Sequence, residues 1–129
     1  MTIGTKNNQI LAYVMSGSWQ YWSQWPMFQH MISDLGNHTY KGIQLSSDNS
    51  YQYGPICIDA TQRGTQTLGE IFEFSLLEMS KQWPVLVTFI NKTNQRSLKA
   101  HQKKLNLDII SEFNWNNNSY YQLGCLTKP

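Results

Sequence analysis

The stretch from Tyr53 to Phe72, with the sequence YGPICIDATQRGTQTLGEIF, constrains the fold more than any other part of the chain. It predicts a strand, then a tight turn that contains Arg63-Gly64, then a long amphipathic helix. A strand that leads through a glycine turn into a helix directs several backbone N–H groups toward one point, and the helix dipole adds positive potential there. The sequence therefore predicts a phosphate-binding turn between this strand and this helix.

The length and composition of the chain indicate one soluble domain. Its 129 residues are expected to form a single unit, residues 1–129, around one core. Hydrophobic residues make up 40% of the chain, which argues against disorder, and a net charge of +2 is too small to indicate nucleic-acid binding. No apolar run is long enough for a membrane span, and the N-terminus lacks the apolar region of a signal peptide. Two cysteines without an export signal indicate reduced thiols, so a cytoplasmic location is expected.

Hydrophobic periodicity predicts strands and helices that alternate along the chain. Gly54-Pro55 marks a bend or bulge, and Asn116-Asn117-Asn118 marks a hairpin. The almost wholly apolar run Val85–Ile90 predicts a central strand that is covered on both faces. The order of elements predicts an α/β or α+β domain with a mixed sheet and at least one parallel strand pair. The expected strands are 10–15, 40–45, 53–58, 85–90, 107–113 and 120–125, and the expected helices are 23–35, 68–79 and about 94–105.

Three segments resemble signatures of the GCN5-related N-acetyltransferase (GNAT) superfamily. ICIDATQRGTQ is similar to its strand-and-turn signature, in which alternating apolar residues precede Arg-Gly-x-Gly. NQRSLKAHQKKLNL resembles a second signature, which Asn94 and Ser97 match, and EFNWNNNSYYQLGCL resembles the last two strands of the family. The resemblance covers roughly residues 52 to 126, and the order and spacing of the segments around VLVTFI make it more specific than any single motif.

The sequence departs from the family pattern at several positions. Gln66 and Leu68 stand where small residues are usual, and His101 stands where a tyrosine is common. The strand at Ile10–Met15 looks like the second strand of the family, so the usual first strand and the two helices after it are expected to be lacking. The segment Gly17–Leu35 is then expected to replace those helices as a wall of the acceptor pocket.

The resemblance implies an acyl-CoA N-acyltransferase fold. This fold has a mixed, mostly antiparallel sheet with a central parallel strand pair splayed apart and helices on both sides. Acetyl-CoA is implied to bind in the gap between the strands at Ile56 and Val87, with its diphosphate on the turn after Arg63. No metal is implied. The residues implied for cofactor binding are Ile56, Cys57, Ile58, Arg63, Gly64, Thr65, Gln66, Thr67, Leu68, Gly69, Asn94 and Ser97.

Transfer in this superfamily is usually direct, with an amine that attacks the thioester. The amine must lose a proton and the departing thiolate needs a donor. His101 is the candidate acid, because histidine can donate a proton near neutral pH. Glu70 and Asp59 are candidate bases, between which the sequence does not select. Purely structural roles are the alternatives: His101 can be an ordinary histidine on a helix face, and Asn94 can be only a helix cap.

Two clusters of side chains have more than one interpretation. Tyr21, Trp22 and Trp25 lie in the segment expected to line the acceptor site, where they would bind an aromatic or cationic amine. Together with Trp19, they would equally cover the core or form a dimer interface, which is the preferred interpretation. The four basic residues of the last helix indicate a solvated face, with contact to the 3′-phosphate of the cofactor as the alternative. These residues are Arg96, Lys99, Lys103 and Lys104.

The sequence therefore supports three hypotheses about function. The first is an acetyl-CoA-dependent N-acetyltransferase that acts on a small-molecule or peptide amine, with no nucleic-acid or membrane partner and with a homodimer left open. The second is a degenerate member of the family that binds acyl-CoA or serves in interactions, which the departures at Gln66 and Leu68 motivate. The third is an aromatic-rich binding module unrelated to CoA.

Overall fold

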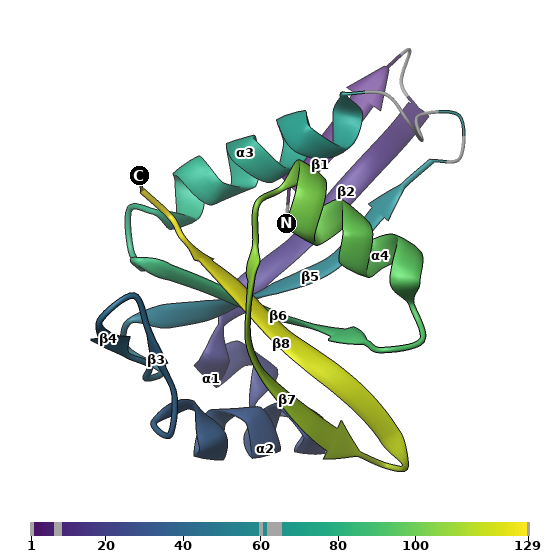
Figure 1. Cartoon of the computed structure of the whole chain (residues 1–129). Coiled ribbons are helices and arrows are strands. Elements are labelled where there is room, and N and C mark those ends of the chain that lie inside the picture. Colours follow the sequence, from purple (N-terminus) through teal and green to yellow (C-terminus); the bar gives the residue numbers. More distant parts are fainter. Residues whose placement is uncertain (1, 7–8, 60, 62–65, 129) are drawn as a thin grey trace.

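A computed structural model describes residues 2–6, 9–59, 61 and 66–128, and it contains one six-stranded and one two-stranded sheet (Figure 1). The order of strands in the large sheet is β1-β2-β5-β6-β8-β7, and β3 and β4 form the small sheet. The strands are β1 (Thr2–Lys6), β2 (Gln9–Ser18), β3 (Thr39–Tyr40), β4 (Ile43–Gln44), β5 (Ser50–Ile58), β6 (Val85–Asn91), β7 (Asp108–Trp115) and β8 (Asn118–Leu126). The helices are α1 (Trp19–Trp22), α2 (Pro26–Leu35), α3 (Thr67–Met79), α4 (Gln95–Lys99) and the π-helical turn η2 (Ala100–Lys104).

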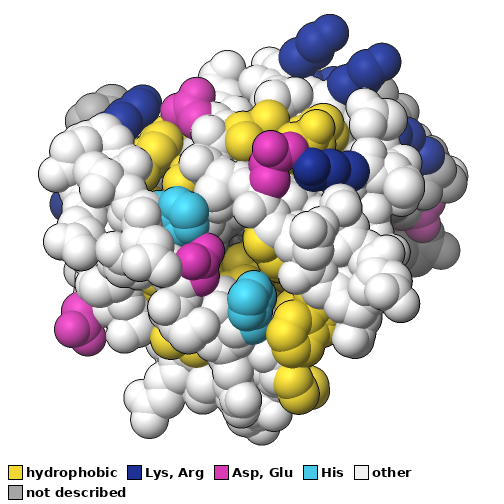
Figure 2. All heavy atoms as spheres, turned by 60° about the horizontal axis from the view of Figure 1, so that its bottom comes forward, with side chains coloured by type: hydrophobic (Ala, Val, Ile, Leu, Met, Phe, Trp, Pro, Cys, Tyr) yellow, Lys and Arg dark blue, Asp and Glu magenta, His cyan; other side chains and the backbone are white. Residues whose placement is uncertain are grey.

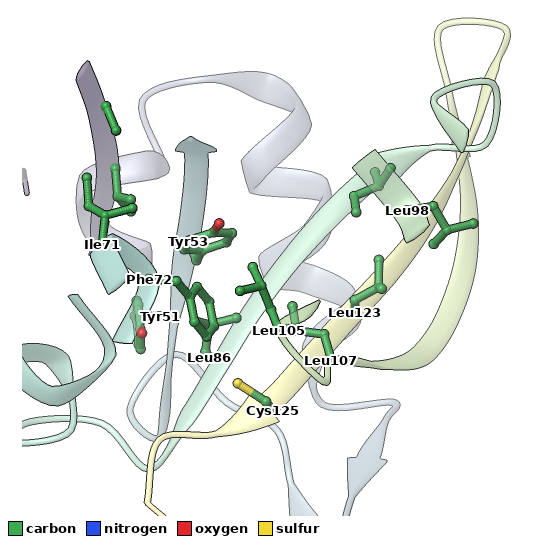
Figure 3. Packing of buried hydrophobic residues seen from close by; sticks show 13 residues of the cluster. Tyr51, Tyr53, Ile71, Phe72, Leu86, Leu98, Leu105, Leu107, Leu123 and Cys125 are labelled. Carbon is green, nitrogen blue, oxygen red and sulfur yellow. The ribbon is translucent and has the colours of Figure 1, made fainter. Parts of the chain in front are cut away.

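Helices cover both faces of the large sheet, as Figure 1 shows. On one face, α3 and the α4–η2 segment pack on a cluster that includes Tyr53, Phe72 and Leu123 (Figure 3). On the other face, α1, α2 and the β3–β4 hairpin pack on a second cluster that includes Trp19 and Val87. This arrangement confirms the predicted α/β class and the mixed, mostly antiparallel sheet.

The parallel pair β5–β6 lies at the centre of the sheet and opens along its length. The two strands pair only at Ser50↔Val85, Tyr51↔Leu86 and Gln52↔Val87. Past Gln52, β5 continues to pair with β2 after a shift in register, and β6 continues in register with β8. In the described part of the chain, no further pairing joins β5 to β6. The predicted splayed strand pair is thus confirmed, and we call the region beyond Gln52 the split.

Local sequence signals account for most of the boundaries. Pro26 occupies the first turn of α2, where its missing N–H costs no hydrogen bond. Asn94 caps α4 by accepting a hydrogen bond from the backbone N–H of Ser97. Asn106 ends η2 with a φ of 58°, as its tolerance of the left-handed region predicts. Asn116 and Asn117 have φ values of 47° and 64° and connect β7 to β8 by a two-residue turn.

Three expectations about elements are corrected by the structure. The segment 40–45 is not one strand: it forms the hairpin of β3 and β4, because Lys41 and Gly42 adopt φ values of 48° and 84° and reverse the chain. β5 begins at Ser50 rather than at Tyr53, and its polar first residues are buried in the sheet. The polar strand β1 and the short helix α1 were not predicted, since neither has a clear apolar period.

Candidate functional site

Polar side chains of β5 and β6 meet at the apex of the split. The carbonyl oxygen of Tyr53, the first residue past the last β5–β6 pair, accepts a hydrogen bond from Thr88 Oγ1 at 2.7 Å. It also accepts one from Gln52 Nε2 at 2.8 Å. These two bonds satisfy a buried carbonyl where strand pairing stops. The β5–β6 pairing can therefore end at the apex without leaving a buried carbonyl unsatisfied, because side-chain donors replace the next hydrogen bond between the strands.

Gly54 follows the apex and changes the direction of β5. Its φ of 101° lies in a region that side chains rarely adopt, so glycine is required for the backbone to turn here. This is the bend that Gly54-Pro55 predicted, and the register between β2 and β5 shifts beside it, between Val14 and Ser16. The bend carries the rest of β5 away from β6.

Beyond the bend, β5 and β6 each have a strand partner on one side only. The predicted cofactor residues Ile56, Cys57 and Ile58 lie on β5 in this half, where they pair with β2. Their backbone groups on the side of the split are available to an extended ligand that carries amides of its own. The geometry therefore fits the pantetheine arm of CoA, which presents two amide groups. The side chain of Ile56 packs on the core cluster.

His101 lies in the core beside Tyr53 and has only 5% of its surface exposed. Its Nδ1 lies 2.7 Å from the carbonyl oxygen of Ser97, and its Nε2 lies 3.2 Å from the hydroxyl of Tyr53. A carbonyl can only accept, so Nδ1 carries the proton and Nε2 accepts from Tyr53. Burial lowers the pKa of His101, although the bond to Ser97 opposes this. His101 is consequently a neutral imidazole at pH 7, and both of its ring nitrogens are engaged.

Tyr53 connects this histidine to the apex of the split. Its ring is 1% exposed and packs edge-to-face on Phe72, and burial raises the pKa of its hydroxyl. Its carbonyl lies at the apex while its hydroxyl bonds His101, so the residue links α4–η2 to the point where the strands part. The π-helical turn that places His101 here is a local irregularity often found at functional sites.

The predicted phosphate turn lies only partly within the described residues. Arg63, Gly64 and Thr65 fall outside them, so the structure does not test the central part of that prediction. Gln66 is exposed at the N-cap of α3 and makes no side-chain cap bond. Thr67, Leu68 and Gly69 form the first turn of α3, and Leu68 packs against the core cluster. The side chain of Leu68 is thus directed toward the core.

The remaining predicted site residues occupy separate places. Asn94 and Ser97 come together in the cap of α4, and Ser97 also holds His101. Glu70 is exposed in the first turn of α3, and Asp59 is exposed after β5, where it accepts hydrogen bonds from Thr61. No hydrogen bond or ion pair described in the structure joins either carboxylate to His101. The acid and base roles therefore stay predictions.

The aromatic segment after β2 divides into a buried and an exposed part. Trp19 and Trp22 are 0% and 7% exposed, so the interpretation as core residues is confirmed for them. Their indole N–H groups donate to Ser50 Oγ and to the carbonyl of Gln52 at 2.9 and 3.2 Å. Tyr21 and Trp25 are 45% and 44% exposed; Tyr21 contacts Trp22 edge-to-face, and the ring of Trp25 is tilted against it. Trp22 thus belongs to the core and the apex, and Tyr21 and Trp25 face solvent.

Sequence reasoning missed three residues that build the apex. Gln52, Tyr53 and Thr88 were assigned only to strands or loops, yet together they end the β5–β6 pairing. A signal was present, because a glutamine and a threonine in otherwise apolar strands require buried partners. No helix within the described ranges is long and apolar enough to span a membrane, and those ranges contain no cluster of three metal-ligating side chains.

No protein-family model matches the sequence, and no curated protein matches it either. Solved structures do match. An N-acetyltransferase from Staphylococcus aureus superposes with a TM-score of 0.62 and 19% identity, over 98% of this chain and 66% of that one. The protein yncA from Salmonella typhimurium, solved with its cofactor acetyl-CoA, superposes with a TM-score of 0.64 and 11% identity, over 98% of this chain and 64% of that one. A GNAT-family acetyltransferase from Streptococcus pneumoniae superposes with a TM-score of 0.61 and 12% identity, over 96% of this chain and 64% of that one. The chain spans about two thirds of the length of these proteins.

Proposed function

Because the chain has the fold of the GCN5-related N-acetyltransferases, we propose that it is an acetyl-CoA-dependent N-acyltransferase that acts on a primary amine. The observation that carries the proposal is the split between β5 and β6, which pair over three residues and then part. A sheet that ends its central pairing with dedicated side-chain donors has a built opening. An extended ligand with amide groups is the chemistry that such an opening accepts.

The backbone of the split would hold the pantetheine arm of the cofactor. Ile56, Cys57 and Ile58 supply the edge of β5, and the residues after Thr88 supply the edge of β6. The proposed diphosphate contacts come from Arg63 to Gly69, at the start of α3, where the helix dipole favours an anion. Asn94 and Ser97 are proposed to order the loop on the other side of the split, since their hydrogen bond fixes the first turn of α4.

Bound acetyl-CoA supplies a thioester carbonyl that the amine nitrogen attacks, so that a C–N bond forms and the C–S bond breaks. Keeping a lysine-like amine neutral at pH 7 costs roughly 4 to 5 kcal/mol, so a base must remove its proton. We assign that role to Glu70, which is exposed and lies next to the proposed diphosphate contacts at the start of α3, so water would have to carry the proton to it from the amine.

We assign to His101 the proton that the departing thiolate receives. Nε2 of the neutral imidazole carries no proton and Nδ1–H is held by Ser97, so Nε2 must first take a proton from water. The hydroxyl of Tyr53 then gives its own proton to the thiolate and regains one from Nε2. The buried pair therefore places one exchangeable proton between α4–η2 and the apex. Burial keeps the hydroxyl of Tyr53 protonated, which makes it a proton carrier rather than a base.

A second candidate function is a degenerate member of this fold that binds acyl-CoA without transfer. Two observations favour it: Gln66 stands where the family has glycine, and both ring nitrogens of His101 already have partners. In that protein, the split would bind the thiol arm and the histidine would serve only to join η2 to β5.

Calorimetric binding and CoA release with a panel of primary amines separate these functions. Acetyl-CoA at 100 times its dissociation constant is expected to raise the unfolding free energy by about 2.7 kcal/mol. Stabilisation together with CoA release supports the transferase, and stabilisation without release supports the degenerate protein. Pantetheine lacks the diphosphate, so its binding tests the split alone. If acetyl-CoA gives no stabilisation at millimolar concentration, both functions are rejected.

A further inference from the structure

An unbroken row of aromatic rings crosses the α2 side of the sheet. It begins in the segment around α1, passes over β6 and ends on the β7–β8 hairpin. We call these residues the aromatic row. Ring centroids are 5.1 Å apart for Tyr21–Trp22, 5.8 Å for Trp22–Trp25, 4.9 Å for Trp22–Phe28, 5.7 Å for Phe28–Phe89, 5.6 Å for Phe89–Tyr120 and 5.2 Å for Phe113–Tyr120.

The aromatic row passes directly over the apex of the split. The indole N–H of Trp22 donates to the carbonyl of Gln52, the last residue of β5 that pairs with β6. Phe89 follows Thr88 on β6 and is the first residue of the row within the unpaired half of that strand. A ligand that lay along the row would therefore reach the apex, which is the inner end of the split proposed to hold the pantetheine arm.

One end of the row faces solvent with large apolar surfaces. Tyr21 and Trp25 are 45% and 44% exposed, whereas aromatic side chains of this size are on average mostly buried in folded proteins. Figure 2 shows this side of the molecule: apolar side chains reach the surface at several places, and the lysine and arginine side chains lie mainly in the upper half of the view. Exposed tryptophan and tyrosine rings next to a proposed reaction centre indicate a binding surface.

A buried acceptor atom without a partner lies beside the row. Gln52 is 1% exposed, and its Nε2 is committed to the carbonyl of Tyr53. Its Oε1 is buried and makes no hydrogen bond in the described structure. The assignment of the two amide atoms is fixed, because a carbonyl accepts only from the nitrogen. Leaving such an oxygen unpaired is costly, so a ligand N–H that displaced the side chains covering Oε1 would gain a hydrogen bond there. Ser16 Oγ and the hydroxyl of Tyr51 are also buried without a partner in the described structure.

The charge of the segment that carries the exposed end of the row limits the class of ligand. Residues 15–35 contain one carboxylate, Asp34, which accepts hydrogen bonds from His38 and Asn37. A polyamine or an aminoglycoside carries several ammonium groups and needs several carboxylates. A monoamine needs only one polar contact for its nitrogen, and ring faces attract a single cation.

We propose, on the basis of the transferase function above, that the acceptor is a primary monoamine carried on an aromatic body. The body packs along the exposed end of the row, against Tyr21 and Trp25. The amine N–H donates to Gln52 Oε1 at the apex, which orients the nitrogen toward the split.

Steady-state kinetics with 2-phenylethylamine, tryptamine and spermidine test this proposal. Both aromatic amines are expected to have a kcat/KM at least tenfold above that of spermidine. Trp25→Ala is expected to raise the KM for 2-phenylethylamine about tenfold, since it removes one ring contact and its buried area. Phe74→Ala is the matched control, because Phe74 is a 60% exposed aromatic residue of α3, on the opposite side of the sheet. Equal kcat/KM values for the three amines, or an unchanged KM in Trp25→Ala, would overturn the proposal.

Gln52→Met tests the second contact with a side chain of similar length. It removes Oε1 and also the bond from Nε2 to the carbonyl of Tyr53, so it is expected to raise the KM for 2-phenylethylamine by a larger factor than the dissociation constant of acetyl-CoA. Calorimetric titration of the wild-type protein with each compound separates the two proposals. Binding of acetyl-CoA without binding of 2-phenylethylamine overturns this inference alone. Binding of 2-phenylethylamine without binding of acetyl-CoA overturns the transferase function and, with it, the acceptor role.

Discussion

The two halves of the β5–β6 pair differ in whether the two strands are hydrogen-bonded to each other. We call the paired half, from Ser50 to Gln52, the closed half, and the unpaired half beyond Gln52 the open half. In the first half, Ser50, Tyr51 and Gln52 pair with β6, and their side chains are at most 1% exposed. In the second half β5 bends at Gly54, and within the described residues each strand bonds only its outer neighbour. The change occurs within one residue, at Tyr53, whose carbonyl accepts hydrogen bonds from two side chains instead of from the neighbouring strand. The opening is thus specified by a few polar residues and a glycine, and weak strand propensity is not its cause.

The largest effect is expected in the closed half, at Gly124. A Cβ on this residue would lie 2.6 Å from the carbonyl oxygen of Leu86 on β6 and 2.7 Å from Ile110 Cδ1. Because neither the strand nor the packed isoleucine can yield easily, Gly124→Ala should lower the unfolding free energy by about 3 kcal/mol. Urea unfolding measures this. Gly36→Ala is the control with no expected loss, since nothing lies within 4 Å of its Cβ.

A smaller loss is expected at the bend that opens the split. Gly54→Ala places a side chain at a φ of 101°, which costs about 2 kcal/mol in backbone strain. The new Cβ would meet Thr88 Oγ1 at an ordinary 3.5 Å, so strain and not a clash is the cause. Urea unfolding gives the loss, and pantetheine titration reports the opening. A variant of full stability would show that the bend does not need glycine.

A further loss of stability is expected when the hydrogen bond between Trp19 of α1 and the closed half is removed. Trp19→Phe removes the hydrogen bond between the indole N–H and Ser50 Oγ, both fully buried, and should cost about 1 kcal/mol. Ser50 keeps its bond to the carbonyl of Ser46, which limits the loss. Thermal unfolding of this variant is compared with that of Trp25→Phe, whose exposed ring should tolerate the change. Equal midpoints for the two variants would contradict the assigned role of Trp19.

The smallest effect is a change in the pH dependence of stability at the open half. Burial lowers the pKa of His101, while in the unfolded chain it is near 6.5. The unfolded chain therefore binds more protons below pH 6.5, and stability is lost as the pH falls from 6.5 toward the folded pKa. His101→Gln cannot titrate, so its stability should fall less between pH 7 and pH 5.5. Urea unfolding at both pH values measures the difference, and parallel losses in the two proteins would reject this assignment.

Much of the fold follows from local sequence signals. Val85–Ile90, Pro26, Asn106 and the asparagine turn predicted a central strand, a helix start, a helix end and a hairpin, all of which the structure confirms. The apex was not predicted, because a polar residue such as Gln52 reads as a surface position until its strand is known to be central. The hydrogen bond between His101 and Tyr53 joins residues 48 positions apart and depends on a π-helical turn that no sequence period announces.

The three residue pairs between β5 and β6 are the only ladder between two halves of the large sheet, within the part of the chain that the structure describes. One half consists of β1, β2 and β5, and the other of β6, β8 and β7. We expect the two halves to twist relative to each other about this narrow junction. A ligand that bonds both free edges joins the halves a second time, so amide hydrogen exchange should slow on both sides of the junction together when the ligand binds.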